Sequence, residues 1–192
     1  MDELRLKQEL ETITKETLRC RKIVTSLLDF ARQSTPTRKA CDINNIVKES
    51  VILTQKQAAF KDVSLSLELD EDMPQLHLDK GQIQQSIINL LINAIEATDA
   101  GGSIWITTAY KRYQERADIY VSDTGQGISE NDLGRIFDPF FTTKDDGSGL
   151  GLAITHGIIE QHNASIDVFS KLGRGTLFTI KFPVKPGEDH VA

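Results

Sequence analysis

Residues 89–97 read Asn-Leu-Leu-Ile-Asn-Ala-Ile-Glu-Ala, and the rest of the fold can be worked out from this stretch. In a helix, side chains four positions apart lie on the same face, so Asn89 and Asn93 project together while the aliphatic residues between them can pack on a sheet. Amide oxygens are hard, neutral ligands that suit Mg²⁺ when the ion also keeps water and phosphate ligands. Two asparagines on a helix are more often ordinary surface residues, so the stretch by itself leaves both interpretations open.

The residues around this helix predict further helices and strands. Asp79, with Gln82 three residues later, resembles a capping box and starts the helix that runs through Thr98. Apolar and polar residues alternate in several flanking segments, as expected of half-buried strands. The predicted strands span 63–69, 76–78, 104–108, 117–121, 165–170 and 176–183, and the other predicted helices span 43–59, 149–162 and a short stretch capped by Ser129. Strands that meet at short turns, with helices on one face, predict an α+β fold built as a two-layer α/β sandwich.

Residues 4–33 predict one long, coiled-coil-like helix. Apolar or small residues recur at alternating steps of four and three, which gives a period near 3.5 and a seam that needs a partner helix. The seam consists of Leu6, Leu10, Ile13, Thr17, Cys20, Val24, Leu27 and Ala31. The alternative is a helix packed on its own globular domain, but a helix of this length spans roughly 45 Å, more than a small domain covers. Pro36 disfavours helical backbone before it and ends the helix.

Length and composition restrict the functions that the chain can have. Its 192 residues allow one large domain, or one domain with an appendage. The net charge of −6 disfavours nucleic-acid binding. The sequence has neither a long apolar run nor a secretory signal, so membrane attachment is expected only through segments upstream of Met1. Cys20 and Cys41 form neither a disulfide framework nor a metal cluster, and we expect them to be inert thiols in a reducing cytoplasm.

A second motif, Asp123-Thr124-Gly125-Gln126-Gly127-Ile128, directly follows a predicted strand. A carboxylate at the end of a strand, followed by glycines, lets the backbone approach a flat ligand closely. The alternative is an ordinary type I turn, which favours aspartate at its first position. This motif alone does not distinguish a ligand site from a turn.

Two further motifs follow. In residues 137–144, Phe-Asp-Pro-Phe-Phe-Thr-Thr-Lys, the aromatic rings can anchor a loop whose threonines and lysine offer donors to phosphate, or they can simply pin the loop.

In residues 147–152, Gly-Ser-Gly-Leu-Gly-Leu, glycines let backbone amides point at an anion over the positive end of a helix. This is not a P-loop, because no Gly-Lys-Ser/Thr follows, and the glycine spacing does not fit a dinucleotide fingerprint. The polar, glycine-bearing residues 138–148 predict a mobile loop.

The order and spacing of these four motifs closely resemble the Bergerat-type ATP-binding fold, which gyrase, the heat-shock chaperone, mismatch-repair ATPases and histidine kinases share. The histidine kinase version is the most similar. Its asparagine box resembles residues 89–97, its glycine boxes resemble 123–128 and 147–152, and its phenylalanine box resembles 137–144. Its last motif resembles Gly175-Thr176 before Phe178.

The resemblance also implies a division of the chain. Residues 1–35 are similar to the second helix of the kinase dimerisation domain. Residues 36–186 are similar to the ATP-binding catalytic domain, with the match itself covering about 43–184. Residues 187–192 are expected to form a disordered tail.

The resemblance implies a role for each matching residue. Asp123 accepts a hydrogen bond from the adenine amino group, and the nearby glycines make room for the base. Asn89 and Asn93 hold Mg²⁺ and the phosphates, and segment 128–147 closes over the nucleotide as a lid. Asn89 and Lys144 are the implied catalytic residues, with Lys144 touching the terminal phosphate. The implied contacts with ATP are Asn89, Asn93, Asp123, Gly125, Gly127, Ile128, Phe137, Thr143, Lys144, Gly147, Ser148, Gly149, Leu150, Gly151, Leu152 and Thr176.

Two departures narrow the expected function. In the related ATPases, a glutamate general base falls where Asn89 stands, and an amide cannot take a proton from water, so fast hydrolysis is not expected. In histidine kinases, the acceptor is a histidine followed by an acidic residue on the first dimerisation helix. None of the four histidines has that context; they are His77, His156, His162 and His190. We therefore expect the first helix upstream of Met1 and the chain to be a fragment.

The expected function is a kinase module that transfers the terminal phosphate of MgATP to a histidine supplied elsewhere, for relay to a response regulator. The full protein is expected to dimerise through the N-terminal helix. One alternative is a non-catalytic nucleotide-binding module whose lid conformation follows the nucleotide. A serine kinase of the anti-sigma-factor type is another, against which the long helix argues. An ATPase switch is disfavoured by Asn89.

Overall fold

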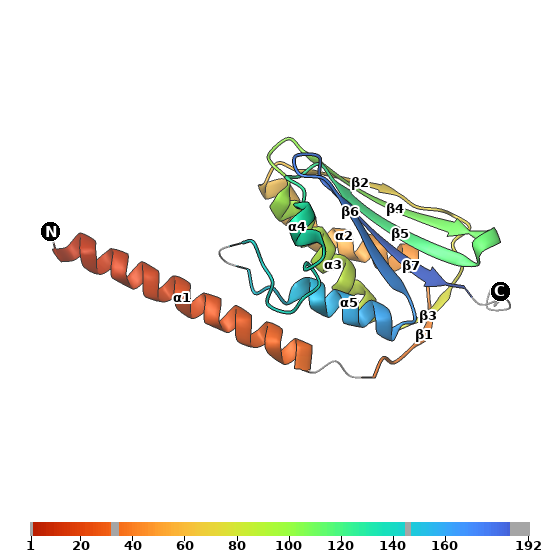
Figure 1. The fold of residues 1–192 in the computed structure, drawn as a ribbon, viewed down its shortest axis with the longest axis horizontal. Helices are drawn as coiled ribbons and strands as arrows, with labels where there is room; N and C mark the ends of the chain where they lie inside the picture. The colour runs from red at the N-terminus through yellow and green to blue at the C-terminus, as the bar shows by residue number, and fades with distance from the viewer. Residues whose placement is uncertain (1, 32–34, 145–146, 185–192) are drawn as a thin grey trace.

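Helix α3 (Lys80–Ala97) lies at the centre of the helical layer, between α2 (Ile43–Phe60) and α5 (Gly151–Gln161). The structure is a computed structural model and describes residues 2–31, 35–144 and 147–184. All three helices cover one side of the main sheet (Figure 1). The residues of α3 that face the sheet and its neighbouring helices are completely or almost completely buried: Ile83, Ile87, Leu90, Leu91, Ala94 and Ile95. The two-layer α/β sandwich predicted from the alternation is confirmed.

The main sheet has five strands in the order β2-β4-β5-β7-β6. Its strands are β2 (Ser64–Glu68), β4 (Ser103–Lys111), β5 (Arg116–Asp123), β6 (Ser165–Ser170) and β7 (Thr176–Pro183). All neighbours are antiparallel except β2 and β4, which are parallel because the chain returns from β2 through α3 before it enters β4. A short 3₁₀ turn, η1 (Arg112–Gln114), joins β4 to β5. Side chains on the helical side of the central strands, such as Ile104, Ile106 and Ile119, are fully buried.

The helix starts follow the predicted caps. The side chain of Asp42 accepts a hydrogen bond from the backbone N–H of Asn45 at the start of α2, and that of Asp79 accepts one from Gln82 at the start of α3. Ser129 caps the four-residue helix α4 (Glu130–Leu133). The last helix was expected from residue 149 and begins at Gly151 instead. These caps fix where each helix enters the layer.

One pairing was not predicted. Strand β1 (Lys39–Cys41) runs antiparallel to β3 (Leu76–Leu78), with Ala40 opposite His77. No strand was expected at residues 39–41, because three residues carry too little alternation to indicate one. This small ladder ties the segment after the first helix to the start of α3.

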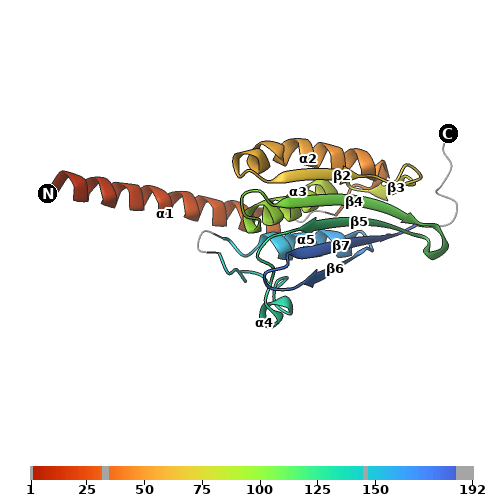
Figure 2. The ribbon, with the colours of Figure 1, turned by 90° about the horizontal axis from the view of Figure 1, so that it is seen from above.

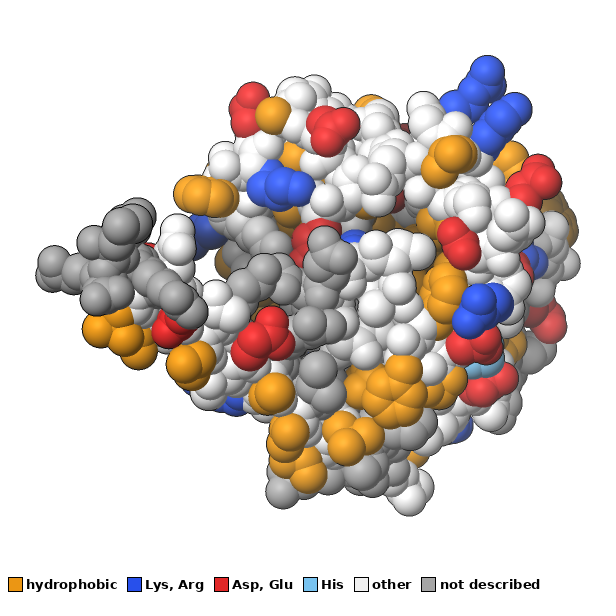
Figure 3. Space-filling model, turned by 60° about the vertical axis from the view of Figure 1, so that its left-hand side comes forward, with side chains coloured by type: hydrophobic (Ala, Val, Ile, Leu, Met, Phe, Trp, Pro, Cys, Tyr) orange, Lys and Arg blue, Asp and Glu red, His pale blue; other side chains and the backbone are white. Residues whose placement is uncertain are grey.

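Helix α1 (Asp2–Ala31) projects away from the globular unit as an arm in both ribbon views (Figures 1 and 2). The described seam side chains are about half exposed, with Leu6 at 57%, Leu10 at 55% and Ile13 at 63% of full exposure. The globular unit therefore does not cover the seam, and exposed hydrophobic side chains follow the arm in Figure 3. The alternative of a helix packed on its own domain is wrong for these residues. Residues 32–34 and the expected disordered tail lie outside the described residues.

Buried His162 links α5 to the start of α3. Its Nε2 accepts a hydrogen bond from the Asp79 backbone N–H at 3.0 Å, and its Nδ1 lies 2.8 Å from the Ile158 carbonyl oxygen. These partners select the neutral ring with its proton on Nδ1. Burial lowers the pKa of His162; nearby Arg38 lowers it further, while the Ile158 contact and Asp79 raise it.

We expect the free energy of unfolding to decrease as the pH falls below about 6.5, the usual pKa of an unfolded histidine. The folded pKa lies below the unfolded one, so the unfolded chain takes up the proton first. The stabilisation is complete above that pH and is lost below it, by at most about 1.4 kcal/mol per pH unit for one proton. Urea unfolding between pH 8 and 5.5 measures this slope. His162→Gln should flatten this slope; the wild-type slope retained in that variant would refute the assignment.

Candidate functional site

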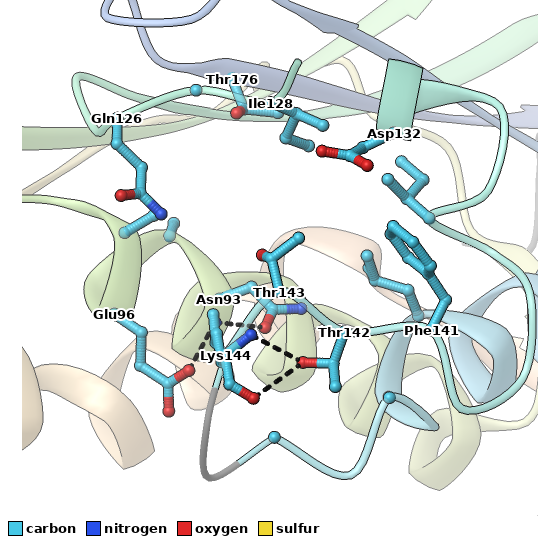
Figure 4. A pocket seen from close by; sticks show the side chains of 18 of the residues that line it. Asn93, Glu96, Gln126, Ile128, Asp132, Phe141, Thr142, Thr143, Lys144 and Thr176 are labelled. Atoms are coloured by element: carbon cyan, nitrogen blue, oxygen red, sulfur yellow. Dashed lines mark hydrogen bonds and ion pairs between the residues drawn. The ribbon is translucent and has the colours of Figure 1, made fainter. Parts of the chain in front are cut away.

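A cavity of about 600 Å³ opens where α3, the end of β5, residues 136–144, residues 147–149 and the start of α5 converge. Figure 4 shows polar side chains directed into it from several elements. Most of the residues predicted to contact ATP line it: Asn89, Asn93, Asp123, Gly127, Ile128, Thr143, Lys144, Gly147, Ser148, Gly149, Gly151, Leu152 and Thr176. Motifs far apart in the sequence are thus brought to one place.

Three predicted contacts lie outside the lining. Leu150 is completely buried, and Phe137 packs on the core with its ring 5.0 Å from that of His156. Gly125 is buried behind Asp123, where a Cβ atom would lie 2.5 Å from the carbonyl oxygen of Ala97. In this structure, these three residues support the walls of the cavity and do not face it.

Asp123, the last residue of β5, lines the cavity. It is 6% exposed, and its Oδ1 accepts hydrogen bonds from the backbone N–H groups of Gly125 at 2.8 Å and Thr176 at 3.2 Å. Both bonds use Oδ1, so Oδ2 is the oxygen that remains for a ligand. Burial raises the pKa of Asp123, and the two N–H donors offset part of that increase. A carboxylate in this setting favours a ligand that donates a hydrogen bond.

The start of α5 also lines the cavity, and it suits an anion. Helix α5 begins at Gly151, and its first backbone N–H groups carry the positive end of the helix dipole. The glycines before it leave the backbone accessible, and Ser148 Oγ accepts a hydrogen bond from Leu150 N at 3.4 Å. A ligand that has both a hydrogen-bond donor and a phosphate group matches Asp123 and the start of α5.

The asparagines of α3 have different partners. Asn89 Nδ2 donates to Thr155 Oγ1 on α5 at 2.9 Å. Asn93 Oδ1 accepts from Lys144 Nζ at 3.2 Å, and the same ammonium group lies 2.5 Å from Glu96 Oε2 (Figure 4). Lys144 belongs to segment 137–144, so this ion pair joins the predicted lid to α3.

Several residues that line the cavity were not predicted from the sequence as ATP contacts, among them Glu96, Gln126 and Leu172. Glu96 follows Asn93 by three positions on the same face of α3, and that spacing is a signal that could have revealed it. Leu172 has no such signal, because the β6–β7 hairpin reaches the cavity through a backbone bond from Gly173 N to Gln126 O of 2.7 Å.

We expect Glu96→Gln to speed backbone hydrogen exchange of residues 141–144 a few-fold in the absence of nucleotide. The variant loses the charge that holds Lys144, and an ion pair this exposed contributes up to about 1 kcal/mol. Glu68→Gln, on the exposed part of β2, is the matched control and should leave this exchange unchanged. ATP should slow exchange in the same segment. Identical lid exchange in both variants would show that the pair does not restrain the lid.

The described histidines lie away from the lining. His77 is on β3, His162 is buried beside Asp79, and His156 is on α5 with its Nδ1 3.4 Å from Glu160. His190 lies outside the described residues. Among the described residues, no group of three His, Cys, Asp or Glu side chains is arranged to hold a metal ion, and no helix is long and apolar enough to cross a membrane.

Comparison with known proteins finds relatives that match about nine tenths of the chain. The chain is 34% identical over 177 residues to sensor histidine kinase ZraS of Escherichia coli K12, a match that covers 92% of the chain and 38% of ZraS. It is 36% identical over 173 residues to sporulation kinase E of Bacillus subtilis 168, covering 90% of the chain and 23% of that kinase. The chain therefore spans less than half the length of these relatives.

Solved structures agree with the sequence relatives. Full-length ShkA in complex with AMPPNP has a TM-score of 0.76 and 28% identity, over 84% of this chain and 35% of that one. Histidine kinase ThkA in complex with the response regulator TrrA has a TM-score of 0.77 and 29% identity, over 94% of this chain and 52% of that one. Residues 78–186 match the family described as histidine kinase-, DNA gyrase B- and HSP90-like ATPase. The chain belongs to this ATPase family, and its ATP-binding domain is of the histidine kinase type.

Proposed function

We propose that this chain is the catalytic part of a sensor histidine kinase, and that it transfers the terminal phosphate of MgATP to a histidine on a helix outside the chain. The observation that carries the proposal is that one cavity is lined both by the buried Asp123 carboxylate and by the start of α5. An adenine nucleotide supplies a group for each: the amino group of its base and its phosphates. Asp123 Oδ2 would accept from the adenine amino group, and the amides around Gly147, Gly149 and Gly151 would bind the phosphates.

The residues present fit a Mg²⁺ ion bound together with the nucleotide. Because the NH₂ group of Asn89 donates a hydrogen bond to Thr155, the carbonyl oxygen of Asn89 remains available to a cation. Asn93 supplies a second amide oxygen one turn later, and no acidic cluster is present among the described residues to hold the ion without phosphate. When bound, Mg²⁺ neutralises charge on the phosphate oxygens.

Lys144 would change partners when ATP binds. Its ammonium group pairs with Glu96 and Asn93 in this structure. A terminal phosphate is a stronger acceptor of the same kind, so Lys144 would move to it and bring the lid with it. Catalysis would then consist of positioning the phosphate and stabilising its charge.

Water is a poor substitute for the histidine acceptor in this site. The Asn89 amide cannot accept a proton. In the same cavity, Asp123 accepts two backbone hydrogen bonds, and Asp132 accepts one from the Ser129 hydroxyl. ATP would therefore be held for transfer rather than rapidly hydrolysed.

The partners follow from the same proposal. The exposed seam of α1 would pair in a homodimer as the second helix of a dimerisation domain within residues 1–35, ahead of a catalytic domain at 36–186. The phosphohistidine would pass its phosphate to a response regulator, the kind of protein with which ThkA was solved. We place this chemistry on the cytoplasmic side, where ATP is available.

Incubation with radiolabelled ATP, with and without a supplied first dimerisation helix, tests the proposal. Acid-labile label should appear on the supplied helix only, and Asn93→Ala should abolish it. Label on the chain alone would overturn the assignment of the acceptor. Tight ATP binding without transfer to the helix would favour the non-catalytic nucleotide-binding module.

A further inference from the structure

The Asn89 amide is held from a second helix. Thr155, on α5, is 1% exposed, and its Oγ1 accepts the 2.9 Å hydrogen bond from Asn89 Nδ2. Gly151 lies one turn earlier on the same face of α5, where a Cβ atom would lie 2.5 Å from Asn89 Oδ1. Two consecutive turns of α5 therefore determine where the Asn89 amide lies: Gly151 leaves room for it, and Thr155 accepts its hydrogen bond.

The bond matters because an amide has an acceptor at one end and two donors at the other. When the oxygen binds a cation, the NH₂ group must point away from the ion and needs an acceptor in the protein. At Asn89, that acceptor is the Thr155 hydroxyl. Without it, the orientation that binds a cation would leave this part-buried NH₂ group without its partner on α5.

The other asparagine of α3 has no comparable support. The bond at Asn93 comes from Lys144 in the lid, whose ammonium group also pairs with Glu96. A helix thus holds Asn89, whereas a lid side chain holds Asn93. The cation-binding oxygen of Asn89 is already in position before any ligand arrives.

We infer that Thr155 is a positioning residue that sets the cation affinity of the nucleotide site through Asn89. The inference rests on the proposed function, because it takes a Mg²⁺–nucleotide as the ligand. Thr155 itself would touch neither the nucleotide nor the ion. Replacing a residue that orients a metal ligand in this way typically changes metal affinity 10- to 100-fold, and we expect an effect at the lower end of that range here.

The test is calorimetric binding of ADP to the whole chain, with saturating Mg²⁺ and with EDTA. Thr155→Val keeps the shape of the side chain and removes the hydroxyl. It should reduce the gain in affinity that Mg²⁺ provides by about tenfold, and leave ADP binding in EDTA unchanged. Thr155→Ser restores an acceptor and should restore the gain. Thr54→Val is the matched control, because Thr54 is another buried helical threonine whose hydroxyl bonds only its own helix.

The possible results distinguish the role of Thr155 from the existence of the Mg²⁺ site. An unchanged Mg²⁺ gain in Thr155→Val would overturn the inference while leaving the proposed function intact, and so would an equal loss in Mg²⁺ and in EDTA. Wild-type protein that binds ADP equally with and without Mg²⁺ would instead remove the proposed Mg²⁺ site, and the inference with it. Thr155→Ala also lacks the hydroxyl and cannot crowd the site, so it replaces the valine variant if that variant does not fold.

Discussion

Asp123→Asn is expected to weaken ATP binding about 30- to 100-fold with little effect on folding. The asparagine oxygen can keep both backbone bonds, from Gly125 and Thr176, that Oδ1 accepts now. Its NH₂ group then takes the place of Oδ2 and faces the adenine amino group, donor against donor. Loss of a charged hydrogen bond costs about 1.5–3 kcal/mol, and the facing donors add to it.

Calorimetric titration with ATP and urea unfolding measure the two effects of this change. The free energy of unfolding should stay within about 1 kcal/mol of wild type, because the buried bonds are kept. Asp99→Asn, an exposed residue beyond the end of α3, removes the same charge and should leave both quantities unchanged. ATP affinity retained in Asp123→Asn would mean that the base lies elsewhere.

Gly175→Ala is expected to destabilise the fold by more than about 3 kcal/mol and to abolish ATP binding. Gly175 has a φ of +86°, and a Cβ atom there would lie 1.9 Å from the carbonyl oxygen of Asp123. The atom in the way belongs to the backbone of β5 and cannot rotate aside. The end of β5 must move, and it carries the carboxylate that faces the cavity.

Gly173→Ala separates this clash from ordinary backbone strain. Gly173 has a φ of +73°, but nothing lies within 4 Å of a Cβ atom at that position. Its replacement should cost only the strain of a left-handed alanine, about 1–2 kcal/mol, and ATP should still bind. Urea unfolding and ATP titration of both variants provide the comparison. Equal losses at the two glycines would show that close packing against Asp123 is unimportant.

Local signals in the sequence predicted most of the layer that carries the site. The caps at Asp42, Asp79 and Ser129 were readable because each bonds a backbone group three residues away. The burial of Leu90, Leu91 and Ile95 followed from helical periodicity. The order of the four motifs, through their resemblance to a known family, brought together residues that no local rule connects.

Contacts between distant segments could not be predicted in this way. The pairing of Lys144 with Glu96 joins residues 48 positions apart, and that of Asn89 with Thr155 joins residues 66 apart. Charged and hydroxyl side chains of this kind occur all along the chain, so only the fold selects the partner. The β1–β3 pairing was missed for the same reason, because strands this short are stabilised by their neighbours rather than by their own pattern.

Titration of the wild-type chain with ATP and with GTP, each with Mg²⁺, is the most direct test of adenine binding at Asp123. Guanine places a carbonyl oxygen where adenine has its amino group, and the Asp123 carboxylate repels it. We expect saturable binding of one ATP per chain, with GTP binding about 10- to 100-fold more weakly. Equal affinity for the two nucleotides, or no binding of either, would contradict this expectation.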